Sequence, residues 1–201
     1  MQKGEKFALF LGMLSGDGCL TIVHNGEGYR DYPIKFCNTN KQLVYKFQSL
    51  LFDVFGLKSK ILVDKRVNKK DLWYISKCSK ENYLKIKEVG FPEGVKRDVL
   101  IIPEIIKNGT DKEKLAFILG FLITDGCLRK NNSILFHSGS KVFLEELSML
   151  ISEFTNTQKT IKEYTQREKY KSYQLNLNKE ETKILLSGMP TWDNGTPLAL
   201  S

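Results

Sequence analysis

Two aspartates, Asp17 and Asp125, each stand directly before a glycine at the end of an apolar stretch. Residues 10–20 read FLGMLSGDGCL and residues 118–128 read ILGFLITDGCL, so seven positions are identical. Hard divalent ions prefer carboxylate, carbonyl and water oxygens as ligands. Such ions can stabilise the attacking and leaving oxygens of a phosphodiester displacement. The repeat therefore points to metal-assisted hydrolysis, provided that the two aspartates meet.

Small residues in each copy predict how the two aspartates could meet. Gly12 and Gly16 lie four positions apart, and so do Gly120 and Thr124 in the second copy. In a helix this spacing places both small residues on one face, which lets two helix backbones approach closely. We expect the two repeated helices to pack against each other about a pseudo-two-fold axis, with both aspartates at the seam.

Two carboxylates at such a seam predict a cation between them. Asp17 and Asp125 would repel each other, and each would lie at the negative end of a helix dipole. A divalent ion would relieve both effects, with Gly16 and Thr124 as further ligands. The simpler interpretation is that each Asp-Gly pair only ends a helix. Its recurrence on two small-faced helices in a basic chain favours the metal site.

Composition narrows the class of partner. The chain has 201 residues, of which 41% are hydrophobic, and this is enough for a hydrophobic core. Its net charge of +8 favours a polyanionic partner such as nucleic acid. Its four cysteines have no metal-knuckle spacing, so they are expected to be reduced, mostly buried thiols of an intracellular protein: Cys19, Cys37, Cys78 and Cys127. No signal peptide or apolar stretch of about 20 residues is present, so a cytoplasmic or organellar location is expected.

The first half is predicted to alternate helices and hairpins. After the first helix, residues 20–23 and 29–37 form a hairpin. A helix over 40–55 begins at a capping box made by Thr39 and Gln42. Further elements complete this half: strands over 59–64 and 72–78 and a helix over 79–89.

The second half repeats this order. A capping box of Thr110 and Glu113 opens the helix that ends in the second aspartate, and another of Asn178 and Glu181 opens the last helix. Between them lie strands joined by a tight turn at residues 131–132, a helix over 141–154, and strands near 159–165 and 170–177. The predicted fold is α+β, with two pseudo-symmetric α-β-β-α-β-β-α halves, each carrying a four-stranded antiparallel sheet. The halves span residues 1–100 and 110–201, and residues 101–109 link them.

Both motif segments, residues 10–18 and 118–126, resemble the LAGLIDADG signature of homing endonucleases. The resemblance covers nearly the whole chain and fits the monomeric two-motif members. It implies a magnesium-dependent enzyme that cuts both strands of a long, pseudo-palindromic DNA target, with manganese or calcium able to substitute in binding. It also implies that each sheet forms a saddle on the DNA, and it makes Asp17 and Asp125 the catalytic metal ligands. The sixth motif position, often acidic in the family, is Ser15 and Ile123 here, which leaves activity undisturbed because that position usually packs between helices.

The resemblance further implies two catalytic side chains in the first half. A polar residue at the end of an early strand corresponds to Asn38, with a counterpart near Ser138. A lysine that follows the last helix of a half corresponds to Lys96 in Gly94-Val95-Lys96. The second half reads Gly188-Met189-Pro190 and has no matching lysine. The two strands are therefore expected to be cut at different rates.

Basic residues gather on the equivalent second hairpin of each half. Residues 58–74 carry a net charge of +4 and residues 159–173 a net charge of +3, which favours contact with phosphates. The side chains expected to contact DNA are Thr21, Val23, Tyr29, Arg30, Tyr32, Lys35, Lys58, Lys60, Arg66, Lys69, Lys70, Arg129, Asn131, Ser133, Lys162, Gln166, Arg167, Tyr170, Lys171 and Tyr173. His24 and His137 lie outside the motifs and are expected at the surface or on DNA rather than in catalysis.

Two other functions stay open at this stage. Some proteins that resemble this family are maturases that assist intron splicing, and a DNA-binding regulator could keep the fold without the chemistry. Both intact aspartates argue against the regulator. The chain starts at Met1 and lacks the terminal residues that protein splicing needs, so it is expected to be free-standing or intron-encoded.

Overall fold

The computed structural model describes residues 1–26, 28–166 and 170–191, with only the backbone at 166 and 170. The first half comprises α1 (Lys3–Asp17), β1 (Gly18–Leu20), β2 (Val23–His24), β3 (Arg30–Asp31), β4 (Pro33–Asn38), α2 (Lys41–Phe55), β5 (Leu62–Asp64), β6 (Leu72–Cys78) and α3 (Lys80–Glu88). The second half comprises α5 (Asp111–Asp125), β7 (Gly126–Leu128), β8 (Ile134–Ser138), α6 (Lys141–Thr155), β9 (Lys162–Gln166), β10 (Tyr170–Leu177) and α7 (Lys179–Gly188). The short helix α4 (Glu104–Lys107) lies between them.

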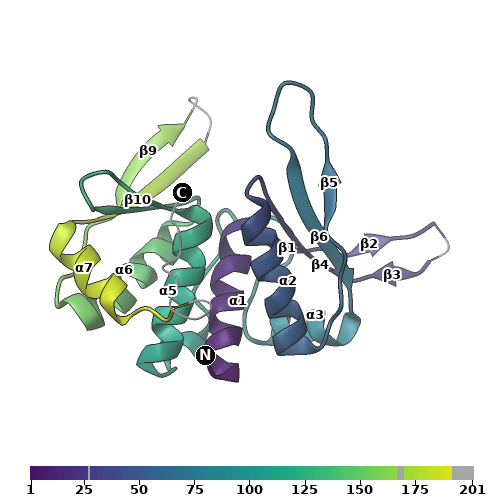
Figure 1. The fold of residues 1–201 in the computed structure, drawn as a ribbon, viewed down its shortest axis with the longest axis horizontal. Helices are drawn as coiled ribbons and strands as arrows, with labels where there is room; N and C mark the ends of the chain where they lie inside the picture. The colour runs from purple at the N-terminus through teal and green to yellow at the C-terminus, as the bar shows by residue number, and fades with distance from the viewer. Residues whose placement is uncertain (27, 167–169, 192–201) are drawn as a thin grey trace.

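The expected fold class is confirmed. Each half has one four-stranded antiparallel sheet, with strand orders β1-β4-β6-β5 and β7-β8-β10-β9. In Figure 1 the helices gather in the lower part of the molecule and the two sheets extend above them on either side. Alternate strand residues such as Ile34, Phe36 and Ile75 are buried, and Phe36 stacks on Phe47 of α2 with 4.3 Å between ring centroids. One face of each sheet therefore packs on helices and the other is left open.

The two motif helices lie side by side at the centre of the molecule, as expected (Figure 1). A Cβ added at Gly120 would lie 2.8 Å from the backbone nitrogen of Met13 and 3.0 Å from Cα of Gly12. A Cβ added at Gly12 would meet the backbone carbonyl of Phe117. The helix backbones thus touch at the glycines themselves, and no larger side chain fits between them.

Helix capping follows the sequence prediction in the second half but not in the first. The capping boxes of Thr110 with Glu113 and of Asn178 with Glu181 are both present. The expected box of Thr39 and Gln42 is wrong, because α2 begins one residue later. There the side chain of Asn40 accepts a hydrogen bond from the backbone nitrogen of Gln42 at 3.0 Å.

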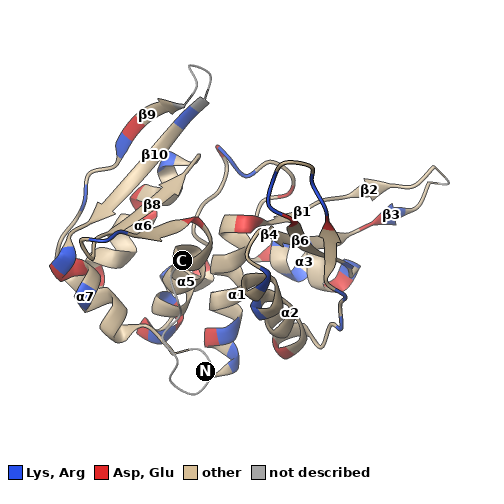
Figure 2. Cartoon of the chain, turned by 45° about the horizontal axis from the view of Figure 1, so that its top comes forward, with Lys and Arg blue, Asp and Glu red and all other residues tan. Residues whose placement is uncertain are grey.

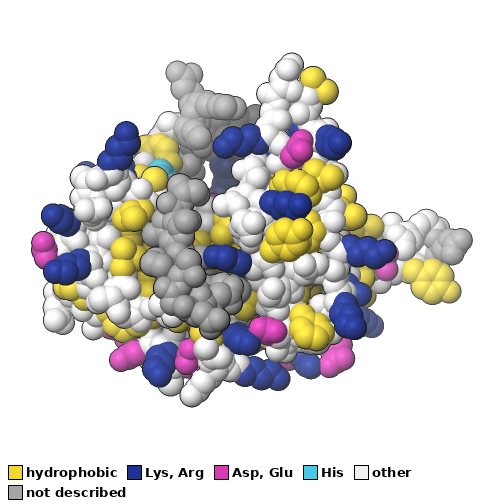
Figure 3. Space-filling view, viewed as in Figure 1, with side chains coloured by type: hydrophobic (Ala, Val, Ile, Leu, Met, Phe, Trp, Pro, Cys, Tyr) yellow, Lys and Arg dark blue, Asp and Glu magenta, His cyan; other side chains and the backbone are white. Residues whose placement is uncertain are grey.

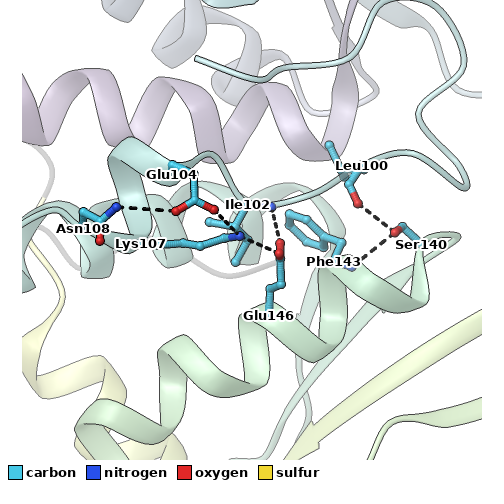
Figure 4. A network of polar contacts seen from close by, with 8 residues as sticks. All are labelled: Leu100, Ile102, Glu104, Lys107, Asn108, Ser140, Phe143 and Glu146. Atoms are coloured by element: carbon cyan, nitrogen blue, oxygen red, sulfur yellow. Dashed lines mark hydrogen bonds and ion pairs between the residues drawn. The ribbon is translucent and has the colours of Figure 1, made fainter. Parts of the chain in front are cut away.

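The segment between the halves is fixed along its length (Figure 4). Ser140, at the start of α6, donates from its hydroxyl to the Leu100 carbonyl at 2.8 Å. Glu146, farther along α6, accepts from the backbone nitrogen of Ile102 and from Nζ of Lys107, each at 2.6 Å. Residues 100–107 therefore run along the second half and are held to α6 by these hydrogen bonds.

Two other expectations need revision. The residues Cys37, Cys78 and Cys127 are exposed and Cys19 is half-buried, so the cysteines are not mostly buried. Their strands present them at the open face or at a strand end, which composition alone does not reveal. None of the helices in the described ranges has the length and apolar content needed to cross a bilayer.

Candidate metal centre and nucleic-acid interface

The two aspartates occupy the last positions of α1 and α5, where the helices leave the interface. A Cβ added at Gly16 would contact the side chain of Thr124 and would lie 3.5 Å from Cγ of Asp125. The absence of a side chain at Gly16 thus lets the end of α5 approach the end of α1. Asp17 and Asp125 are thereby brought to one seam, as the small-residue pattern predicts.

Asn38 orients the first aspartate. It ends β4, which pairs with β1, and its Nδ2 donates to Oδ2 of Asp17 at 2.5 Å. Its own Oδ1 accepts from the backbone nitrogen of Asn40 at 2.6 Å. Because the amide is held at both ends, the carboxylate of Asp17 has one favoured direction.

Lys96 brings a positive charge to the same seam. Its Nζ donates to three carbonyl oxygens at the end of α1, at 2.9 Å for Leu14, 2.8 Å for Ser15 and 2.6 Å for Gly16. A backbone hydrogen bond of 2.8 Å from Gly94 to Leu20 ties the preceding loop to β1. The ammonium therefore neutralises the negative end of the α1 dipole.

Burial makes the seam electrostatically costly. Burial, together with the charge of Asp17, raises the pKa of Asp125 to about 6, although Lys96 opposes this shift. Burial also raises the pKa of Asp17, against the hydrogen bond from Asn38 and the charge of Lys96. Burial lowers the pKa of Lys96 to about 8, while the two aspartates hold it up. A further cation at the seam would favour both carboxylates in their charged form.

The surroundings of the two aspartates differ. Ser138 ends β8 as Asn38 ends β4, and its hydroxyl accepts from the backbone nitrogen of Ser140 at 3.1 Å. This contact repeats the one between Asn38 and Asn40, so the two positions are equivalent. A serine side chain is shorter than asparagine, and it is the Asn38 side chain that donates to a carboxylate of the seam.

The donor set suits a hard divalent ion but is small. Within the described ranges, no group of three or more His, Cys, Asp or Glu residues could hold a metal. The Gly16 carbonyl already accepts from Lys96, and the hydroxyl of Thr124 donates to carbonyls of its own helix. The two aspartates are therefore the side chains that could bind an ion here, and its ligand shell would be completed by water or by substrate oxygens.

The open sheet faces carry polar residues that sequence reasoning missed. Strand pairing places Tyr74 and Ser76 on the face opposite the core residue Ile75, and Gln174 and Asn176 on the face opposite Leu175. The buried Ile75 and Leu175 show which side chains along each strand point away from the helices. The sequence contains this alternation, but it can be interpreted only when the strand register is known.

Most expected DNA contacts lie at the surface, but three are placed elsewhere. The exposed ones are Val23, Tyr29, Arg30, Lys58, Lys60, Lys69, Lys70, Arg129, Asn131, Lys162 and Lys171, while Thr21, Lys35 and Arg66 are half-buried. Tyr32 packs on Tyr83 of α3, Tyr173 packs against the core, and Ser133 is buried with its hydroxyl donating to Asn131.

The remaining candidates and the histidines complete the surface. Gln166, Arg167 and Tyr170 lie outside the residues whose side chains are described. Both histidines lie on strands, His24 exposed on β2 and His137 on β8, where its Nδ1 lies 3.0 Å from the hydroxyl of Tyr164. Figure 2 shows basic residues along the loop between β5 and β6 and on the β9–β10 hairpin.

Comparison with known proteins identifies the class that this fold and seam define. The sequence profile of the LAGLIDADG-like domain matches residues 4–89 and 112–187, so the chain belongs to the LAGLIDADG family, with two copies of the domain. A search of curated proteins found no match.

Solved structures share the whole architecture. The homing endonuclease I-DmoI in complex with DNA and calcium has a TM-score of 0.72 and 20% identity, over 96% of this chain and 96% of that chain. The homing endonuclease I-WcaI bound to its DNA recognition sequence has a TM-score of 0.61 and 13% identity, over 94% of this chain and 81% of that one. Full-length DUF199/WhiA from Thermatoga maritima has a TM-score of 0.63 and 13% identity, over 96% and 57%. At these identities the likeness shows the fold.

Proposed function

We propose that this protein is a site-specific endonuclease that hydrolyses both strands of a long DNA target with magnesium. The observation that carries the proposal is the seam where Asp17 and Asp125 meet in one chain, beside Lys96 and Asn38. A fold kept only for DNA binding would not need two partly buried carboxylates that repel each other.

Each residue of the seam has a distinct task in this proposal. Asp17 and Asp125 would hold magnesium, which when bound stabilises negative charge on the phosphate and activates water. Asn38 keeps the carboxylate of Asp17 in one orientation. Lys96 lies close enough to influence both carboxylates, and it offsets part of their repulsion before DNA and metal arrive.

The open sheet faces would receive the DNA. The surplus charges, +4 over residues 58–74 and +3 over residues 159–173, would contact phosphates on either side of the seam. Tyr74, Ser76, Gln174 and Asn176 would reach base edges, since amides pair well with adenine and hydroxyls with either donors or acceptors. Related proteins support this partner: I-DmoI has been crystallised with DNA and manganese, and a variant of it with its target DNA in the presence of magnesium.

The decisive experiment is selection of cleaved duplexes from a randomised DNA library in the presence of magnesium. We expect one family of sites to be enriched, and Asp17→Asn to cut the selected site at least about 1000-fold more slowly, because several kcal/mol of metal-derived stabilisation would be lost. Asp111→Asn, at an exposed aspartate at the opposite end of α5 from Asp125, is the matched control and should cut normally.

Two outcomes would overturn the proposal. One is unchanged cleavage by Asp17→Asn, which would place the chemistry elsewhere. The other is rescue of intron splicing in vitro without nicking at any selected site, which would favour a maturase.

The unequal surroundings of the aspartates predict unequal strand cutting. We expect Asn38→Ala to slow one strand about tenfold or more relative to the other, because it removes a hydrogen bond to a charged group. Ser138→Ala, at the equivalent position of the second half, should change either rate less than about twofold. The rates are measured with a selected duplex labelled separately on each strand. Equal slowing of both strands by Asn38→Ala would contradict the assigned asymmetry.

A further inference from the structure

The two halves differ in the hairpin that leaves the motif helix. Gly18 and Gly126, which begin β1 and β7, are 108 residues apart, whereas their strand partners Phe36 and Phe136 are 100 apart. The first half therefore has eight more residues in this hairpin than the second. In the second half the same connection is a tight turn, where Arg129 and Ser133 are joined by a backbone hydrogen bond of 2.8 Å.

The additional residues build a ribbon from β2 and β3. Val23 pairs with Asp31 and His24 pairs with Arg30, in the same register as Cys19 with Lys35 in β1 and β4. The ribbon is thus the outer part of one long hairpin, interrupted next to Pro33, which has no N–H to donate. In Figures 1 and 3 it projects from the side of the first half, away from the central helices.

The ribbon is formed locally and its side chains are exposed. Its tip is closed by backbone hydrogen bonds of 3.0 Å, one from Asn25 to Tyr29 and one from Gly28 to Asn25. The side chain of Asn25 also donates to Asp31 at 3.0 Å. Val23 is 40% exposed and Tyr29 is 70% exposed. A two-stranded ribbon is only marginally stable by itself, so these exposed groups suit a contact made on binding.

The chemistry of the ribbon differs from that of the basic hairpins. Residues 21–31 contain Glu27, Arg30 and Asp31 and carry a net charge of −1, while residues 58–74 carry +4. By strand alternation Val23, Tyr29 and Asp31 continue the row of Lys35, which lies on the open face of the sheet. An aliphatic group, an aromatic group and a carboxylate in that row suit base edges, including the methyl group of thymine and the amino group of cytosine, better than phosphates.

We propose that the β2–β3 ribbon reads base pairs outside the reach of the second half, so that the DNA target is longer on the side bound by the first half. Eight residues in a hairpin add four to each strand, or about 13 Å of length. This length corresponds to about four base pairs when the ribbon lies along the duplex. The target is then asymmetric in length, although the two sheets are equivalent.

This inference rests on the proposed function, and the experiment separates the two. Duplexes are first selected for binding in calcium, and the best is then shortened one base pair at a time from either end. We expect loss of the outer four or so pairs on one side to weaken binding by the native chain about tenfold, which is the loss of one good base contact. A variant with residues 22–32 replaced by Lys-Asn-Asn, the sequence of the corresponding turn at residues 130–132, lacks the eight additional residues and should bind the full and the shortened duplex equally.

Point variants test which face of the ribbon makes the contact. The double variant Val23→Ala with Tyr29→Ala should lose the dependence on the outer pairs, as the shortened ribbon does. His24→Ala with Arg30→Ala, on the opposite face, should weaken binding to both duplexes to the same degree and keep the native tenfold difference between them. If removal of the outer base pairs weakened binding by the native chain and by the shortened-ribbon variant to the same degree, the inference would be overturned. If magnesium produced no cleavage of the selected duplex, the proposed function would fail, while the asymmetric binding could still be measured.

Discussion

Replacing Asp125 by asparagine is expected to stabilise the metal-free protein at neutral pH and at the same time to abolish cleavage. The carboxyl is mostly buried and lies beside a second carboxylate, and its pKa is raised to about 6 from an ordinary value of 3.8. Its ionisation at neutral pH therefore costs folding free energy, by about 2 kcal/mol after allowance for residual solvent. Asparagine has nearly the same shape and carries no charge.

The sign of the effect sets its dependence on pH. A carboxyl with a raised pKa contributes its full stability below pH 3.8 and loses that contribution as the pH rises through about 6. The melting temperature of Asp125→Asn should thus exceed that of the native chain by about 4–8 °C at pH 7.5, and by little at pH 4. Thermal unfolding followed by circular dichroism in EDTA measures both values, with Asp71→Asn as the exposed control.

Magnesium provides the complementary measurement. It should raise the melting temperature of the native chain more than that of Asp125→Asn, because a bound ion stabilises only the folded state that holds it. A lower melting temperature for the variant at pH 7.5 would mean that the charged carboxylate of Asp125 stabilises the fold instead of destabilising it. The proposed role of the seam would then lose its electrostatic basis.

The seam itself was predictable because its signals are local and repeated. Gly12 and Gly16 define a helix face by their spacing alone, and Asp17 follows on the same helix. The repeat then supplies the partner helix without any long-range information. Capping boxes such as Thr110 with Glu113 are local in the same way, since both partners lie within one helical turn.

The open sheet surface could not be predicted to the same degree. A shift of one residue in strand register moves every side chain to the other face. Tyr32 and Tyr173 were expected on DNA, but the observed pairing turns both toward the helices. The burial of Ile75 and Leu175 is what identifies their neighbours Ser76 and Asn176 as candidates for DNA contact. The β2–β3 ribbon was hidden for a related reason, because one long hairpin with an interruption has the same residue pattern as a hairpin with a loop.

The glycines of the helix interface should be the least replaceable residues of the fold. Alanine is a better helix former than glycine by about 1 kcal/mol, so Gly120→Ala would stabilise an isolated α5. In the protein, the added methyl group would lie 2.8 Å from the backbone nitrogen of Met13 and 3.0 Å from Cα of Gly12. Backbone atoms cannot rotate away as a side chain can, so the two helices must separate. We expect a net loss of about 3 kcal/mol or more in the free energy of unfolding, measured by urea denaturation.

Gly26→Ala is the matched control, because a Cβ at Gly26 has nothing within 4 Å. It should change the free energy of unfolding by less than about 0.5 kcal/mol. Separation of the helices would also move Asp17 away from Asp125, so the fraction of Gly120→Ala that stays folded should cleave poorly even in excess magnesium. Native stability with Gly120→Ala would show that the helices do not touch at the glycines, and the reason for the two aspartates to share one site would disappear with that contact.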